Sequence, residues 1–304
     1  MDMDLYKECR LCPRNCGVDR TNGKIGYCGE TSVPSVARAA LHYWEEPCIS
    51  GKNGSGTVFF CGCSLKCVYC QNHCIAKGEA KGKPVDSQRL CQIYFELKEK
   101  GAHNINLVTA THFTPHVVES VKMAKSKGLD IPIVYNTSGY ETVENIKRLA
   151  GTVDIYLPDF KYFDADVAKK YSNASDYPKF ALNAIEEMLK QVGLPVLEDG
   201  IMKKGVIVRH LVLPGHVKAS KSAIEAIYNA FGDDVYVSIM KQYTPMPHVM
   251  LFGDEFKSLK RTLTKGEYKS VVDHAAKLGI VNGFVQYGDN AKESFIPAFD
   301  NEGV

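Results

Sequence analysis

Two patterns of hydrophobic residues alternate along the chain from residue 51 onward. Short runs of apolar and β-branched residues predict strands, and segments in which apolar residues recur every three or four positions predict helices that pack on a sheet. Because this alternation is typical of βαβ units, we predict an α/β fold with a parallel sheet. Six strands are predicted, at residues 57–60, 104–108, 131–135, 153–157, 206–213 and 235–240.

Helices are predicted between and after these strands. One carries the apolar stripe Leu90, Ile93, Tyr94 and Leu97 and ends at Gly101. Six βα units are too few to close an eight-stranded barrel, so we predict an open, partial (β/α)6 TIM-like barrel whose open side needs a lid or a partner. The other helices are predicted at residues 114–128, 179–193, 224–231 and 264–279, the last opened by a capping box of Thr264 and Glu267.

The chain divides into three parts by composition. Residues 1–50 are rich in cysteine and glycine and have little apolar periodicity, so we interpret them as an N-terminal metal-binding extension. Residues 51–250 hold the barrel, in which the long interval 152–205 indicates an insertion with a tight turn at Glu198-Asp199-Gly200. Residues 251–304 are predicted to form a C-terminal helical extension and tail, and the pattern from residue 283 onward predicts no element.

The charge balance excludes some classes of partner. The 304 residues include 37 Lys+Arg and 35 Asp+Glu, so the net charge of +2 is far from the basic excess typical of nucleic-acid-binding proteins. No apolar run approaches the roughly 18 residues of a membrane span. The acidic start Met1-Asp2-Met3-Asp4 lacks the basic and apolar regions of a signal peptide. We therefore expect a cytoplasmic protein with neither a membrane nor a nucleic acid as partner.

All eleven cysteines lie in the first third of the chain. The odd count, the tight spacings and the lack of an export signal argue against disulfides, because a reducing cytosol leaves such thiols free to bind metals. We therefore expect metal ligation. The cysteines occupy positions 9, 12, 16, 28, 48, 61, 63, 67, 70, 74 and 91.

One cysteine motif directly follows the first predicted strand. Cys63-x3-Cys67-x2-Cys70 places three thiols within eight residues at the carboxyl end of that strand, where the active sites of βα barrels gather. Three thiolates can hold three irons of a cubane cluster and leave the fourth iron open to a substrate or cofactor. The alternatives are a zinc site completed by Cys61, Cys74 or His73, and three unrelated core cysteines.

This motif resembles that of the radical S-adenosylmethionine (SAM) superfamily. Tyr69 precedes the third cysteine, and Cys70-Gln71-Asn72 is similar to the Cys-His-Asn of glycyl-radical-enzyme activating enzymes. Over nearly its full length the chain resembles the pyruvate formate-lyase activating enzyme-like proteins. The matching stretches are Cys12-Pro13-Arg14-Asn15-Cys16, Glu45-Glu46-Pro47, residues 101–109 and residues 208–215.

The resemblance implies a chemistry. Cys63, Cys67 and Cys70 would hold a [4Fe-4S] cluster whose open iron binds SAM through its amino and carboxylate groups. One electron from the cluster, supplied by a flavodoxin- or ferredoxin-type donor, would cleave SAM to a 5'-deoxyadenosyl radical that abstracts a hydrogen atom from the substrate. The protein would place the reactants and exclude water and oxygen.

The resemblance also implies contacts to SAM from the ends of successive strands. Where superfamily members often carry Gly-Gly-Glu, this chain has Thr109-Ala110-Thr111-His112, which lacks the carboxylate. Of Arg209 and His210, only one can face the barrel interior. Asn136-Thr137-Ser138-Gly139 can equally be a turn, and Asp159 and Lys161 can equally form a structural salt bridge. The predicted cofactor contacts are Tyr69, Asn72, Thr109, Thr111, Asn136, Ser138, Asp159, Lys161, Arg209 and Gln242.

A second group of cysteines precedes the barrel. Cys9, Cys12, Cys16 and Cys28 supply four thiols within twenty residues, which suffice for one tetrahedral zinc ion or for a second iron–sulfur cluster. Spacing does not separate these two possibilities. We expect the segment to need its metal to fold, because it has few apolar residues.

Three functions follow. The first is a radical SAM enzyme that acts on a protein or peptide, as a glycyl radical activator does. The second is the same chemistry on a small molecule or another macromolecule. The third is a non-catalytic iron–sulfur or zinc redox module.

Overall fold

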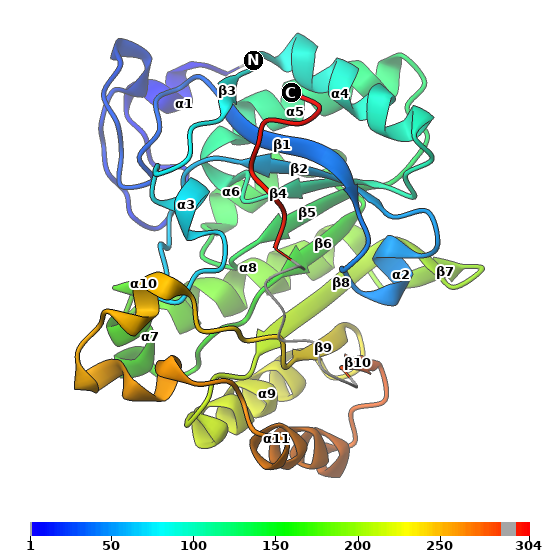
Figure 1. The fold of residues 1–304 in the computed structure, drawn as a ribbon. Coiled ribbons are helices and arrows are strands. Elements are labelled where there is room, and N and C mark those ends of the chain that lie inside the picture. The colour runs from blue at the N-terminus through cyan, green and yellow to red at the C-terminus, as the bar shows by residue number, and fades with distance from the viewer. Residues whose placement is uncertain (1, 287–295) are drawn as a thin grey trace.

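The computed structural model describes residues 2–286 and 296–304, which form a ten-stranded sheet with helices around it (Figure 1). The sheet order is β10-β9-β8-β6-β5-β4-β2-β1-β3, with β7 paired to β8. The strands are β1 (Ser35–His42), β2 (Ser55–Phe60), β3 (Lys83–Pro84), β4 (Ile105–Val108), β5 (Ile133–Thr137), β6 (Ile155–Pro158), β7 (Val196–Glu198), β8 (Ile201–Leu211), β9 (Tyr236–Met240) and β10 (Gly283–Val285).

The barrel is partial, as predicted. From β2 through β4, β5, β6, β8 and β9 to β10, each strand pairs in parallel with the next, and this order begins and ends at different strands. The six predicted strands are β2, β4, β5, β6, β8 and β9. Strand β8 begins earlier than predicted because it forms a hairpin with β7 across Asp199-Gly200, both with positive φ.

Helices follow most of the parallel strands. The predicted capping box of α11 is present, and Gly279 ends that helix with φ 92°. The helices are α1 (Asp4–Lys7), α2 (Pro47–Ser50), α3 (His73–Ala76), α4 (Ser87–Glu99), α5 (Thr114–Ser126), α6 (Val143–Arg148), α7 (Ala165–Ser172), α8 (Tyr177–Val192), α9 (Val217–Phe231), α10 (Pro247–Met250) and α11 (Lys265–Leu278), with 3-10 turns at Arg20–Asn22, Thr111–Phe113 and Asp254–Lys260.

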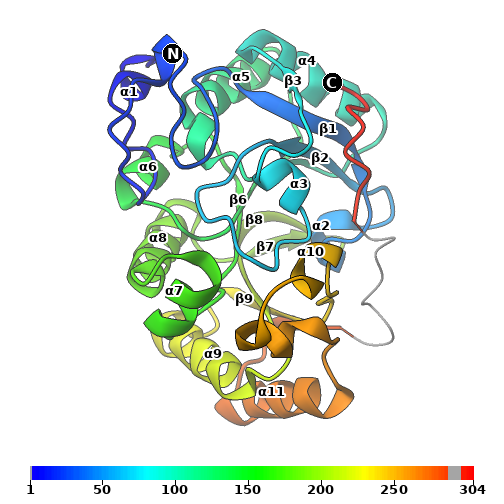
Figure 2. The same cartoon turned by 60° about the vertical axis from the view of Figure 1, so that its left-hand side comes forward.

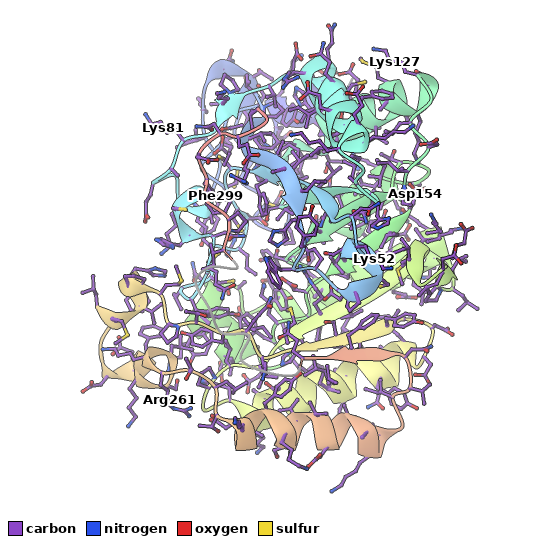
Figure 3. The ribbon with its side chains drawn as sticks, turned by 45° about the vertical axis from the view of Figure 1, so that its right-hand side comes forward. Lys52, Lys81, Lys127, Asp154, Arg261 and Phe299 are labelled. Atoms are coloured by element: carbon purple, nitrogen blue, oxygen red, sulfur yellow. The ribbon has the colours of Figure 1, made fainter. Side chains whose placement is uncertain are left out.

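Two segments outside the predicted strands complete the edge of the sheet. Strand β1, within the segment expected to be a metal-binding extension, pairs antiparallel with β2. The C-terminal segment 296–304 runs along β1, where the Ala39 N–H donates to Glu302 O at 2.8 Å and the Asn301 N–H to Ala37 O at 2.9 Å. Phe299 of this segment packs on Phe59, and Figure 3 shows it over the sheet. The chain therefore covers part of the barrel side with its own terminus.

The interior of the barrel is layered. Short helix α2 inserts Cys48 and Ile49 among the inward-facing apolar residues of β5, β6 and β8, which fills the end of the barrel nearer the strands' amino ends. Two positions further along these strands the inward residues become polar, because strand side chains alternate between faces. The polar positions Asn136, Asp159 and Arg209 therefore lie toward the carboxyl ends.

The amino-terminal segment is anchored to the barrel. Tyr6, Cys9 and Leu11 form a small apolar core of their own, which the sequence did not predict. The Tyr6 hydroxyl hydrogen-bonds His116 Nδ1 at 2.8 Å, and buried Arg20 donates to His112 O at 2.7 Å. Among the described residues, no helix combines the length and the apolar character needed to cross a membrane.

Candidate active site

The cysteine loop leaves the carboxyl end of β2 through a sharp bend. Gly62 has φ 79°, and a Cβ there would lie 2.5 Å from Glu30 and 2.9 Å from Cys28 O, so only glycine fits. The loop folds back on Cys63, whose Sγ accepts the N–H groups of Leu65 at 3.3 Å and Lys66 at 3.4 Å. Figure 2 shows this loop and α3 in front of the strands, beside α10.

The three cysteines of the loop open into one cavity at the carboxyl ends of the strands. Its empty volume is about 1320 Å³, part of which is open to solvent. No other cysteine of the described residues lines it. The predicted site residues that line this cavity are Cys63, Cys67, Tyr69, Cys70, Asn72, Thr109, Asn136, Ser138, Asp159, Lys161, Arg209 and Gln242.

Thr111 is the one predicted contact that does not line the cavity. It is buried, and its hydroxyl donates to Glu141 Oε1 at 2.6 Å, as does the hydroxyl of Thr137. Burial raises the pKa of Glu141 to about 7 despite these donors. Thr111 therefore supports the cavity wall from behind, because Thr137 lines the cavity and shares this carboxylate with it.

Thr109 adopts an unusual backbone conformation. Its φ of 60° lies in the left-handed region that favours glycine, and its N–H donates to Asn136 O at 2.9 Å. For a β-branched residue this conformation is strained, by roughly 1–3 kcal/mol. This strained residue directly follows β4 and lines the cavity.

A charged network forms the floor of the cavity. Lys161 Nζ lies 2.6 Å from Asp159 Oδ2, and Arg209 Nε lies 2.9 Å from Asp159 Oδ1. Burial alone would raise the pKa of Asp159, but Arg209 and Lys161 outweigh it and hold that pKa below its usual value. Asp159 is therefore ionised and holds both cations in place.

Arg209 is held by three partners. Besides Asp159, its guanidinium donates to Glu45 Oε2 at 3.0 Å and to Asn136 Oδ1 at 2.6 Å. Arg209, rather than His210, faces the interior. His210 is buried against Phe160 O, and burial lowers its pKa to about 4, so it is a neutral structural residue.

Sequence reasoning missed several cavity residues. Glu45, Trp44 and His42 come from the end of β1 and the segment after it, and Ile296 and Pro297 come from the C-terminal segment. Glu45 was noted only as part of a matching stretch, and no local pattern indicated that β1 and the terminus reach the barrel.

The amino-terminal cysteines lie beneath the loop rather than in the cavity. Cys9, Cys12 and Cys28 are buried, and Cys16 is half-buried with its Sγ accepting the Tyr27 N–H at 3.2 Å. The backbone of this group touches the cysteine loop, because the Cys63 N–H donates to Cys28 O at 3.2 Å.

The arrangement of the loop thiols bears on which metal group they fit. Within residues 2–286 and 296–304, no three His, Cys, Asp or Glu side chains converge as ligands of one metal ion. A zinc site needs its ligands about 2.0–2.3 Å from a single ion, whereas the thiolates of a cubane bind different irons. Three thiols that face one cavity match the ligand set of a cubane cluster with one open iron.

Comparisons with known proteins identify the family of this chain. A family model described as the radical SAM superfamily matches residues 57–226, more than half of the chain. An uncharacterized protein of Methanocaldococcus jannaschii, MJ0674, is 28% identical over 291 residues, covering 91% of this chain and 77% of that protein.

One solved structure supports the fold. The FeFe-hydrogenase maturase HydG from Carboxydothermus hydrogenoformans matches with a TM-score of 0.52 and 15% identity, over 73% of this chain and 50% of HydG. Streptococcus suis SuiB bound to its precursor peptide SuiA matches with a TM-score of 0.49 and 12% identity, over 74% of this chain and 46% of SuiB. The chain thus spans about half the length of these structures. On the family match, with the cysteine motif inside it, the chain belongs to the radical SAM superfamily.

Proposed function

We propose that this protein cleaves SAM at a [4Fe-4S] cluster held by Cys63, Cys67 and Cys70, and that it removes a hydrogen atom from a protein or peptide. The observation that carries the proposal is that these three thiols share one cavity with the polar ends of the neighbouring strands. When bound, the cluster supplies the electron that splits SAM into methionine and a 5'-deoxyadenosyl radical.

The chain's own residues prepare this cavity for a charged cofactor. Lys161 lies near enough to Cys67 and Cys70 to interact with them electrostatically, and it is held there by Asp159. Its ammonium group would offset negative charge on the thiolates. Asn136, Ser138 and Thr109 line the same wall and offer hydrogen bonds to a ribose or an amino acid group.

The choice of a protein or peptide substrate rests on two features. The motif Cys70-Gln71-Asn72 is similar to that of glycyl radical activators, and the cavity extends from the cysteine loop to Trp44, whose surface is 56% exposed. A hollow that reaches the surface can admit a peptide loop. A flavodoxin- or ferredoxin-type protein is the electron donor that we propose.

A second metal group at the amino-terminal cysteines is a further part of the proposal. Cys9, Cys12 and Cys28 are buried close to the cysteine loop, so a cluster there would lie near enough to relay electrons. Zinc, with a purely structural role, is the alternative that metal analysis of the purified protein distinguishes.

Anaerobic reconstitution tests the main proposal. Protein loaded with iron and sulfide, then given dithionite and SAM, should form 5'-deoxyadenosine and methionine. The matched control is Cys91→Ala, which removes a buried thiol of α4 outside both cysteine groups and should retain turnover. A fully loaded cluster without either product would leave only a redox module.

The substrate class needs a separate experiment. Loaded protein is mixed with candidate glycyl radical enzymes of the host, and the glycine-radical doublet is sought by electron paramagnetic resonance. A doublet supports the proposal. SAM cleavage without a doublet for any candidate would favour a small molecule or another macromolecule as substrate.

A further inference from the structure

One cysteine of the loop has a side-chain hydrogen-bond donor from a distant part of the chain. Ser172, the last residue of α7, places its hydroxyl 3.0 Å from Cys67 Sγ, and both residues are buried. The two residues are 105 positions apart. The contact is therefore a feature of the tertiary fold and not of the loop itself.

Ser172 is the end of a chain of three buried hydroxyls. Its Oγ lies 2.8 Å from the Tyr162 hydroxyl, which lies 2.7 Å from the Tyr69 hydroxyl. The Tyr162 hydroxyl donates to Tyr69, so Tyr69 passes no proton toward the sulfur. Ser172 and Tyr162 are the two hydroxyls that hydrogen-bond Cys67 itself.

The backbone around Ser172 is held against the cysteine loop. Arg14 donates to the carbonyls of Ser172 at 2.9 Å and Asn173 at 2.6 Å, and its Nε donates to Ser64 O in the cysteine loop at 2.8 Å. One guanidinium therefore clamps the end of α7 onto the loop. The Val68 N–H, which donates to Tyr171 O at 2.8 Å, adds a second tie.

We infer that the hydroxyls of Ser172 and Tyr162 raise the reduction potential of the cluster held by Cys67. A hydrogen bond to a cluster thiolate draws off negative charge and so stabilises the reduced form, which carries one more electron. In a buried site such a hydrogen bond is electrostatically stronger than in water. This inference rests on the proposed function, because it needs the cluster.

Cys67 is where this tuning can be tested, because its partner is a side chain. The donors to Cys63 Sγ are the backbone N–H groups of Leu65 and Lys66, which no substitution of those side chains removes. Ser172→Ala removes one hydroxyl and leaves the backbone carbonyl that Arg14 holds. Ser172→Thr keeps the hydroxyl.

The experiment is a redox titration of the reconstituted full-length protein, followed by electron paramagnetic resonance, with iron and sulfide counted in each variant. Ser172→Ala should shift the midpoint potential to a more negative value at full cluster content. Tyr162→Phe should shift it the same way by less. Ser172→Thr should stay near wild type.

A matched control comes from another buried pair. Tyr94 hydrogen-bonds Ser120 at 3.0 Å between α4 and α5 and does not line the cavity, so Tyr94→Phe removes a similar hydroxyl and should leave the potential unchanged. If Ser172→Ala does not take up a cluster, the direction of the potential shift in Tyr162→Phe tests the inference instead.

The outcomes separate this inference from the proposed function. An unchanged midpoint potential in cluster-loaded Ser172→Ala overturns the inference alone. If Ser172→Ala does not load, an unchanged potential in loaded Tyr162→Phe does the same. Wild-type protein that takes up no cluster overturns the proposed function and the inference together. A negative shift in the variants that Tyr94→Phe does not share supports the inference.

Discussion

The two cysteine groups of this chain look alike in sequence and differ in place. Both combine x2 and x3 spacings, yet Cys63, Cys67 and Cys70 open into the cavity at the strand ends, whereas Cys9, Cys12 and Cys28 are buried under the loop. Only the first group meets the charged ends of the parallel strands. Spacing therefore identifies a metal-binding segment, and the position relative to the sheet decides which segment can do chemistry.

The groups are nevertheless joined. The Cys63–Cys28 backbone hydrogen bond and the contacts of Arg14 tie the amino-terminal segment to the loop at several points. We expect the amino-terminal segment to stabilise the conformation of the cysteine loop, whichever metal it holds.

The largest expected effect is the difference in SAM cleavage and iron content between a variant of the loop cysteines and a variant of the amino-terminal cysteines. Cys67→Ala should abolish SAM cleavage and lower the iron content, because a cluster ligand is lost. Cys12→Ala should lower solubility or electron delivery and spare the catalytic cluster. Iron and sulfide counts with 5'-deoxyadenosine assays on both variants check this, and equal cluster loss in the two would show that they are one site.

Removing the hydrogen bonds that join the amino-terminal segment to the cysteine loop should have the second largest effect. Arg14→Ala loses charged hydrogen bonds to Ser64, Ser172 and Asn173, so the free energy of unfolding should fall by about 2–4 kcal/mol, with faster loss of iron. Denaturant titration and timed iron release measure both. The control Arg10→Ala, an exposed arginine nearby, should change stability by about 0.5 kcal/mol or less. Equal effects of the two would contradict a stabilising role.

Glu141, which lies behind the cavity wall, predicts a pH dependence. Its pKa of about 7 in the folded protein lies above the ordinary 4.5, so the folded state binds the proton more tightly than the unfolded state. The free energy of unfolding should therefore fall as pH rises from about 4.5 to 7, by up to about 3 kcal/mol from this group. Denaturant titrations across this range should show a flatter profile for Glu141→Gln. An unchanged profile would mean that Glu141 is ionised throughout.

Cys16→Ala should have the smallest effect. Cys16 is half-buried, unlike Cys9, Cys12 and Cys28, and its sulfur accepts a backbone N–H. We expect its loss to lower the free energy of unfolding of the protein by less than about 1 kcal/mol, measured by denaturant titration. A destabilisation as large as that of Arg14→Ala would contradict this.

Local patterns were enough to predict the barrel strands and the cysteine loop. The six parallel strands and the inward position of Arg209 follow from the alternation of buried side chains. Strand β1 was missed because Ser35–His42 is rich in alanine, which has a low strand propensity. The division of the chain at residues 50 and 250 stays a prediction.

Contacts between distant parts of the chain were the part that the sequence could not supply. Glu45 reaches Arg209 from 164 positions away, and Ser172 reaches Cys67 from 105. The C-terminal segment brings Ile296 and Pro297 into the cavity by pairing with β1. Hydrophobic periodicity records which face of an element is buried, but it does not record which polar partner that face meets.

The central claim is that one iron of the strand-end cluster has no protein ligand and binds SAM. Reduced, reconstituted protein given SAM labelled with ¹⁵N at its amino group should show a ¹⁵N coupling to the cluster by electron–nuclear double resonance. Absence of that coupling in a fully loaded cluster, or zinc bound at Cys63, Cys67 and Cys70, would contradict the account.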